Sequence, residues 1–386
     1  MENIVRAMMN LISCEVCGRE PEKPQCVLTD EEMTKLYRLS KSHDLAHLVG
    51  DALIKSGFIE NNALKAEFKK QIMLAFFRGE KISYEYDRLK NALSEAQIPF
   101  MPLKGAVMRE YYPEPWMRTS CDIDILVRQK DSDAAQEVLT GRYGYTYHGK
   151  GPHDVSLFSP SKIHVELHYG LVEDGRANAA ARVLENIWDA AFLHEGSAYL
   201  YEMPDEYFYF YHIAHMAKHF EIGGCGIRPF IDLWILDRLC GADVQKRNEL
   251  LEKGGLLKFA DAARKLSNVW FDKAEHDNIT KQTEEYILRG GVYGNSENRV
   301  TLQQQKQGGR IKYALSKIFI PYDVIRFHYP ILQKHKWLTP IMEVRRWGKL
   351  IFCGHLKRTV KEMRYNNSIS KDKAQSAREF LNSLGL

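Results

Sequence analysis

Two aspartates, Asp122 and Asp124, stand two residues apart in a stretch whose end, Ile123 to Val127, is mostly apolar and β-branched. Such a run predicts a short buried strand. Side chains at positions i and i+2 leave the same face of a strand, so both carboxylates point the same way. Each carboxylate makes the other harder to ionise, and a divalent cation relieves that repulsion. Oxygen ligands favour Mg²⁺ or Mn²⁺ over zinc. Taken by itself, the pair of aspartates has an alternative interpretation, which is a polar strand end at a sheet edge.

A third acid and a basic turn flank this stretch. Downstream, residues 163–168 alternate apolar and polar side chains, which is typical of a half-buried strand with Glu166 and His168 on its polar face. Upstream, an extended apolar run ends in Lys104 and Gly105 and leads into a predicted helix. A strand that ends in glycine before a helix points free backbone N–H groups at its open end. This turn therefore suits a phosphate, and Lys104 adds a positive charge.

At these residues the chain resembles the uncharacterised nucleotidyltransferase family of the DNA polymerase β-like superfamily. The resemblance rests on Leu103-Lys104-Gly105, Tyr111 to Pro115, Arg118 with Asp122-Ile123-Asp124, and Val165 to His168. It extends from about residue 100 over most of the chain, and it also includes Glu206, His212, His215, His219, Arg228 to Leu233 and, weakly, Pro321 to Trp347. The usual Gly-Gly or Gly-Ser turn of the superfamily is Lys104-Gly105-Ala106 here, which offers no hydroxyl.

The resemblance implies a metal-dependent nucleotidyltransferase. Such an enzyme moves a nucleoside monophosphate from a nucleoside triphosphate, for example ATP, to an acceptor hydroxyl and releases pyrophosphate. Asp122 and Asp124 would bind two Mg²⁺ (or Mn²⁺) ions, and Glu166 would complete the acceptor-side site and take the proton. The acceptor, which the sequence does not identify, is a small molecule, a protein or RNA. A catalytically silent nucleotide- or RNA-binding regulatory module is the alternative, and metal-dependent release of pyrophosphate separates the two.

Basic residues and a histidine would surround the nucleotide. The expected contacts are Lys104, Gly105, Arg118, His168 and Arg228. Arg118 would stabilise phosphate charge or orient the aspartates, with a structural ion pair as the alternative. Arg228 precedes a predicted helix and either faces a phosphate or pairs with Asp232. The sequence leaves open the roles of His212, His215 and His219, although the resemblance implies that their helix lines the active cleft.

The elements that must position these side chains predict an α+β fold, in which a small mixed-sheet nucleotidyltransferase core is flanked by helical regions on both sides. Strands are expected at 100–103, 123–127, 144–148, 154–158 and 163–169, with helices at 106–112 and 131–139. We divide the chain into an N-terminal helical region (1–95), the α/β core (96–172), a helical domain (173–300) and a basic helical C-terminal region (301–386). A linker is expected at 303–309, and the N-terminal helices are expected to pack on the sheet.

The charge of the chain is unevenly distributed. The 386 residues carry a net charge of +4, but from residue 301 onward 17 Lys and Arg stand against 5 Asp and Glu, which leaves −8 for the first 300 residues. Aromatic residues such as Trp337 and Trp347 lie among these basic residues. The region therefore favours contact with nucleic acid, or else forms ordinary solvated helix faces.

Membrane and secreted classes are not expected. The sequence has no apolar run of 18 residues and no secretory signal pattern at its start. Seven scattered cysteines indicate reduced thiols. We therefore expect a cytoplasmic protein with no membrane partner.

Overall fold

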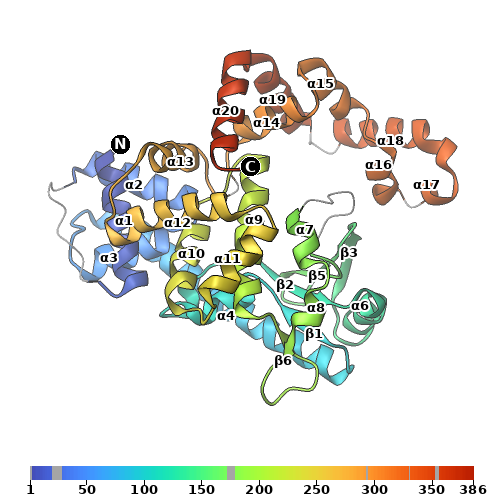
Figure 1. The fold of residues 1–386 in the computed structure, drawn as a ribbon, viewed down its shortest axis with the longest axis horizontal. Coiled ribbons are helices and arrows are strands. Elements are labelled where there is room, and N and C mark those ends of the chain that lie inside the picture. The colour runs from blue at the N-terminus through green and yellow to red at the C-terminus, as the bar shows by residue number, and fades with distance from the viewer. Residues whose placement is uncertain (1, 20–27, 172–178, 293, 330, 353–355) are drawn as a thin grey trace.

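A five-stranded mixed sheet carries the predicted acids (Figure 1). The computed structural model describes residues 2–19, 28–171, 179–292, 294–329, 331–352 and 356–386. The strand order is β1-β2-β5-β4-β3, in which β2 and β5 run parallel and the other neighbouring pairs run antiparallel. The strands are β1 (Phe100–Pro102), β2 (Asp122–Val127), β3 (Thr146–Lys150), β4 (Asp154–Phe158) and β5 (His164–His168). The predicted α+β fold with a mixed sheet is confirmed.

The two faces of the sheet differ in chemistry because apolar and polar residues alternate along its central strands. Ile123, Ile125 and Val127 of β2 point to one side, where they form a core with α4 (Asn62–Glu95) and α6 (Ser132–Arg142). The aspartates of β2 point to the other side, toward the helices that follow the sheet in the chain. The buried apolar face fixes the register, because a shift of one residue would bring the aspartates into the core.

Helix α4 joins two hydrophobic cores. At 34 residues it is about 50 Å long. Phe68, near its start, packs in the core of the N-terminal helices, whereas Ile82, Leu89 and Leu93 pack against the sheet. The other N-terminal helices are α1 (Glu2–Cys17), α2 (Asp30–Ser42) and α3 (Ala46–Lys55). Of the N-terminal helices, α4 packs on the sheet as predicted, whereas α1 packs on α3 and α12 (Leu257–Asp272) instead.

The segment after the sheet is helical, as predicted. Its elements are α7 (Ala179–Leu184), α8 (Ile187–Ala190), β6 (Phe192–Leu193), β7 (Tyr201–Glu202), α9 (Asp205–Ile222), α10 (Arg228–Leu239), α11 (Val244–Lys253), α12 and α13 (Asn278–Leu288). Buried aromatic residues of α9, α10 and α12 interlock around Phe220, whose ring contacts those of Phe230 and Phe259. Large rings of this kind dominate the energetics of a core. Helix α9 is thereby held firmly against α10 and α12.

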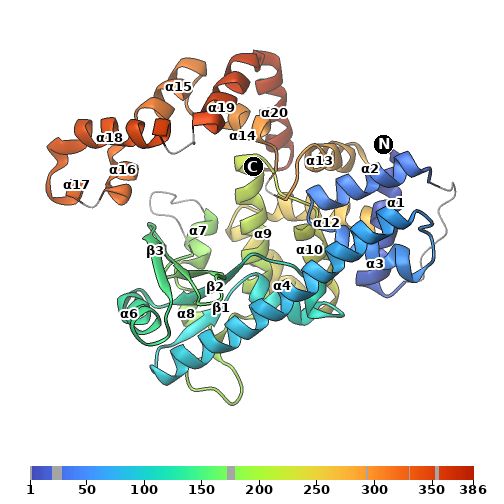
Figure 2. The same ribbon diagram turned by 180° about the vertical axis from the view of Figure 1, so that it is seen from behind.

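The C-terminal helices form a separate layer, seen in Figures 1 and 2 in orange and red. They are α14 (Ser296–Lys306), α15 (Arg310–Ile318), α16 (Tyr322–His328), α17 (Ile331–Lys334), α18 (Thr339–Phe352), α19 (Leu356–Ser368) and α20 (Lys371–Ser383). The predicted linker is wrong in its first part, because residues 303–306 belong to α14. The buried amide of Gln304 donates to Asn366, which ties α14 to α19. Helix α14 also crosses the proposed boundary at residue 300. The division of the chain into four regions stays a prediction.

No described helix is both long enough and apolar enough to cross a membrane.

The packing of α4 on the sheet leads to a stability prediction. The Leu89 side chain is fully buried in the core beneath the acids. Leu89→Ala should lower the free energy of unfolding by about 2–5 kcal/mol, because it removes apolar contacts and leaves a cavity. Urea denaturation followed by circular dichroism measures the loss. Phe77→Ala on the same helix is the control, because Phe77 is 62 % exposed, and it should change stability by less than about 0.5 kcal/mol. Equal losses in the two variants would contradict this assignment of the buried face.

Candidate active site

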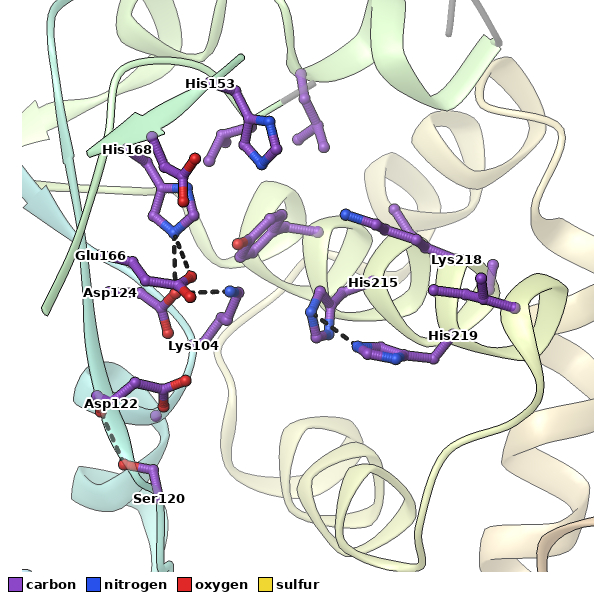
Figure 3. Close-up of a pocket in the computed structure, with 18 of the residues that line it drawn as sticks. Lys104, Ser120, Asp122, Asp124, His153, Glu166, His168, His215, Lys218 and His219 are labelled. Atoms are coloured by element: carbon purple, nitrogen blue, oxygen red, sulfur yellow. Dashed lines mark hydrogen bonds and ion pairs between the residues drawn. The ribbon is translucent and has the colours of Figure 1, made fainter. Parts of the chain in front are cut away.

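Parallel pairing of β2 with β5 brings the three predicted acids together. The register places Asp122 beside His164 and Asp124 beside Glu166. One ligand atom each from Asp124, Glu166 and His168 lie within 4.8 Å of one another, as do atoms of Asp122, His164 and Glu166. Glu166 is common to both groups, so it links the two aspartates. Figure 3 shows Asp122, Asp124, Glu166 and His168 on one side of the sheet, with their side chains pointing into a shared space.

Lys104 and His168 both contact the Asp124 carboxylate. The Lys104 ammonium lies 2.6 Å from Oδ1, and Nε2 of His168 lies 2.9 Å from the same oxygen. Nε2 of His168 is also 3.4 Å from the Glu166 carboxylate. Asp124 itself is buried. A buried carboxylate needs such partners, because water cannot solvate it.

The pKa values of the two aspartates are shifted in opposite directions. Burial would raise the pKa of Asp124, but the charge of Lys104 and the hydrogen bond from His168 outweigh burial and hold that pKa far below its ordinary value. Burial and the neighbouring Asp124 raise the pKa of Asp122. Burial alone would lower the pKa of His168, but its hydrogen bonds to Asp124 and Glu166 raise it. Asp124 is therefore ionised throughout the physiological range, and Asp122 carries unrelieved repulsion.

The basic turn has an unusual backbone. Lys104 adopts φ 46° and ψ −118°, a region that glycine occupies readily and other residues avoid. This conformation ends β1 and starts the short helix α5 (Gly105–Met108). The predicted helix after the turn is thus α5 followed by a 3₁₀ turn at Arg109–Tyr111. The backbone strain is offset by the ion pair that the Lys104 side chain forms with Asp124.

The two predicted arginines line the same space as the acids. Arg118 donates through Nε and Nη2 to both oxygens of Asp232 on α10, each at 2.8 Å, and the Tyr112 hydroxyl donates to the same carboxylate. Arg228 donates instead to Asp44 at 2.5 Å and to the Thr119 hydroxyl at 2.9 Å. Asp232 is therefore paired with Arg118 and not with Arg228. The structural ion pair weighed for Arg118 exists, and the role of either arginine toward a phosphate stays a prediction.

Helix α9 forms the wall opposite the acids. Tyr211, His215, Lys218 and His219 share one face of this helix, and all four line the cavity. Nε2 of His215 and Nε2 of His219 are 3.3 Å apart. Burial lowers the pKa of His219 to about 4, and burial together with the charge of Lys104 holds the pKa of His215 well below its ordinary value. Both imidazoles are therefore neutral at pH 7.

His212 has a different place. Its Nε2 lies 2.9 Å from the Pro229 carbonyl oxygen, so it links α9 to α10. It is absent from the cavity lining, unlike His215 and His219. The sequence groups the three histidines on one helix without separating these two roles. The spacing of four residues through Tyr211, His215 and His219 is the signal that distinguishes the cavity face.

The cavity between the sheet and α9 has a volume of about 870 Å³. Every predicted site residue lines it: Lys104, Gly105, Arg118, Asp122, Asp124, Glu166, His168 and Arg228. Asp44 and Arg78 also line it, although no motif in the sequence marks them. Asp44 follows α2 in a left-handed turn (φ 56°), and only tertiary packing brings it to the site.

Comparison with known proteins bears on this arrangement. A family model described as uncharacterised nucleotidyltransferase matches residues 29–272. The chain belongs to this family. The match includes the whole sheet and α9, which form facing walls of the cavity, and it starts earlier than the resemblance noted from about residue 100. No curated protein and no solved structure matches the chain significantly. Membership of the uncharacterised nucleotidyltransferase family supports nucleotidyl transfer as the general activity.

The buried pair between Arg118 and Asp232 leads to a second prediction. Arg118→Ala should lower the free energy of unfolding by about 3–5 kcal/mol, because it leaves the Asp232 carboxylate buried without its partner. Arg78→Ala is the matched control, because its pair with Asp44 is about one-third exposed on both sides and should be worth less than about 1 kcal/mol. Thermal unfolding of the metal-free protein measures both. Wild-type stability of Arg118→Ala, together with weaker nucleotide binding, would instead assign Arg118 to the phosphates.

Proposed function

We propose that the protein is a metal-dependent nucleotidyltransferase that transfers a nucleoside monophosphate from a nucleoside triphosphate to an acceptor hydroxyl. The observation that carries this proposal is the convergence of Asp122, Asp124 and Glu166 at the wall of a cavity opposite α9. The general activity follows from family membership. The cavity volume lies in the range of small-molecule and cofactor sites. In the reaction, a bond forms between the acceptor oxygen and the α-phosphorus, and the bond to the pyrophosphate oxygen breaks.

The donor set fits Mg²⁺ or Mn²⁺. Asp122, Asp124 and Glu166 would hold the metal, since hard oxygen ligands suit these ions. The low pKa of Asp124 keeps one ligand ionised. Burial and repulsion from Asp124 raise the pKa of Asp122, and a cation would relieve that repulsion. When bound, the metal would stabilise the negative charge that builds up on the reacting phosphate.

The remaining groups would bind the substrates or orient the metal ligands. Glu166 is the acid on the neighbouring strand, where it can accept the proton of the acceptor hydroxyl. His168 donates to Asp124, or to Glu166, and so fixes the orientation of a carboxylate. Lys104, together with the backbone at Gly105, would hold the departing pyrophosphate at the end of β1. Tyr211, His215 and His219 would exclude water from the opposite side.

Nucleotide binding should depend on the two aspartates. In a thermal-shift assay with ATP, GTP, CTP and UTP, each with Mg²⁺, Mn²⁺ or EDTA, a triphosphate at a hundred times its dissociation constant should stabilise the wild type by about 2.7 kcal/mol. The shift should require metal and should disappear in Asp122→Asn/Asp124→Asn, because the metal ligands are lost. Asp133→Asn, an exposed change on α6, is the control and should shift like the wild type.

Two outcomes count against the proposal. An Asp124→Asn variant that releases pyrophosphate as fast as the wild type would rule out the metal assignment. A metal-dependent shift without pyrophosphate release, with small molecules, proteins and RNA each tested as acceptor, would favour the silent nucleotide-binding module.

Lys104 should compete with the metal for Asp124. Because its ammonium lies 2.6 Å from Oδ1, Lys104→Met should strengthen binding of Mn²⁺ alone by roughly tenfold, which corresponds to about 1.4 kcal/mol. The same variant should weaken binding of the metal–triphosphate complex, because a phosphate partner is lost. Titration calorimetry measures both affinities. Lys218→Met on the opposite wall is the control and should leave Mn²⁺ affinity unchanged; a drop in Mn²⁺ affinity in Lys104→Met would contradict the competition.

A further inference from the structure

Residues 310–349, which we call the C-terminal arm, expose an unusual number of large apolar side chains. Ile311 is 77 % exposed, Trp337 is 72 % exposed and Val344 is 62 % exposed. A soluble surface tolerates single exposed apolar residues but seldom a group of them. The full exposed set in the arm is Ile311, Leu315, Ile318, Phe319, Val324, Ile331, Trp337, Ile341 and Val344.

Part of this set lies on α15 and α18, which contact each other directly. Ile311, Leu315 and Ile318 recur at helical spacing on one face of α15, opposite the buried Tyr313. The next residue, Phe319, contacts the ring of Trp347 on α18, with the ring centroids 5.6 Å apart. The indole N–H of Trp347 donates to the Ile318 carbonyl oxygen at 2.8 Å, which locks the two helices together.

On α18 the surface continues one turn at a time. Val344 lies three residues before Trp347, and Ile341 lies three residues before Val344, so both extend the same face. Both are exposed. The arm therefore presents a broad apolar face and not a set of isolated residues.

The same arm is strongly basic. By sequence it contains nine Lys and Arg against two acids, Asp323 and Glu343. Glu343 is buried, where it accepts from Arg346 and from the Ile320 backbone N–H, both at 2.7 Å. Its charge is thus used inside the arm. The exposed basic residues are Arg310, Lys312, Lys334, Lys336, Arg345 and Lys349, and none of them forms an ion pair with another described residue.

Charge and side-chain type decide between the partners that such a face could contact. A second copy would bring two faces of the same positive charge together, which opposes self-association. Single-stranded nucleic acid is held by stacking on aromatic rings, and the face contains mostly aliphatic side chains, which cannot stack on bases in this way. An anionic bilayer matches both properties, because its headgroups attract Lys and Arg and its interface accepts Trp, Ile and Val.

We propose that the C-terminal arm docks on an anionic membrane surface, with its apolar face in the headgroup region and its basic side chains on the lipid phosphates. This contact lies on the bilayer and does not cross it. The proposal differs from the sequence-based expectation of no membrane partner. The inference does not depend on the proposed function.

The arm is attached beside the cavity. It follows α14, whose Lys306 pairs with Glu221 of α9 at 2.8 Å, and Glu221 lines the cavity. In Figures 1 and 2 the arm extends toward the same end of the molecule as β3 and α7. Docking would therefore hold the cavity at a fixed position relative to the membrane.

Flotation of the full chain with lipid vesicles tests the proposal. The protein should bind vesicles that contain phosphatidylcholine and phosphatidylglycerol at low salt, and it should bind them less at high salt. It should not bind vesicles that contain only phosphatidylcholine. Lys334→Glu/Lys336→Glu should weaken binding by about tenfold or more, because each basic residue near an anionic surface contributes measurably. Trp337→Ser and Ile311→Ser/Val344→Ser should weaken it as well, since the apolar contact is lost.

Matched controls lie on α4, which also exposes apolar and basic side chains. Lys69→Glu/Lys70→Glu and Phe77→Ser change exposed residues outside the arm and should bind vesicles like the wild type. Thermal unfolding of every variant should match the wild type, because all the substituted residues are exposed.

Three results would overturn the proposal. The first is equal binding, or no binding, to anionic and neutral vesicles. The second is binding to single-stranded RNA that Lys334→Glu/Lys336→Glu abolishes, without vesicle binding, which would assign the face to nucleic acid. The third is self-association in light scattering that Trp337→Ser abolishes, without vesicle binding, which would assign it to a second copy.

Discussion

Repulsion among clustered carboxylates, of which Asp124 is buried, is the constraint around which the cavity is built. The parallel pairing of β2 with β5 places Asp124 beside Glu166, and the alternation along β2 adds Asp122 on the same face. Three acids at such distances repel one another, and the repulsion is reduced when positive charge lies beside them. Lys104 supplies that charge from the end of β1, and it does so from a strained backbone position. The strand order, the turn at Lys104 and the hydrogen bond from His168 all serve the same requirement.

A second layer of ion pairs fixes the sheet relative to the helices. Arg118 precedes β2 and reaches Asp232 on α10, while Arg228 at the start of α10 reaches back to Asp44 and Thr119. The first pair joins the segment before β2 to α10, and the second joins α10 to the turn after α2, so charged contacts as well as packing hold α10 in place. Such contacts are directional, which hydrophobic packing alone is not.

The sequence predicts the chemistry of the sheet better than that of the helices. Strands of period two place Asp122, Asp124 and Glu166 on definite faces, and the register then follows from burial, so this cluster could be predicted. Asp44 could not, because nothing local distinguishes it from any other acid in a turn and only the packing of α2 and α3 brings it to the cavity. The partner of Arg118 could not be predicted either, since Asp232 lies 114 residues later and two arginines are candidates to pair with it. The 303–306 stretch was wrongly expected to be a linker, because its glutamines suggest a solvated loop and the buried partner, Asn366, is remote in sequence.

The continuous helix α4 determines which parts of the molecule can move. Its first half belongs to the core of the N-terminal helices and its second half to the core under the sheet. It contains no proline at which it would bend sharply. The sheet and the N-terminal helices are therefore connected through one continuous helix, which resists opening of the cavity between them. The wall formed by α7, a short helix whose Ala180, Ala181 and Leu184 line the cavity, is not part of this connection.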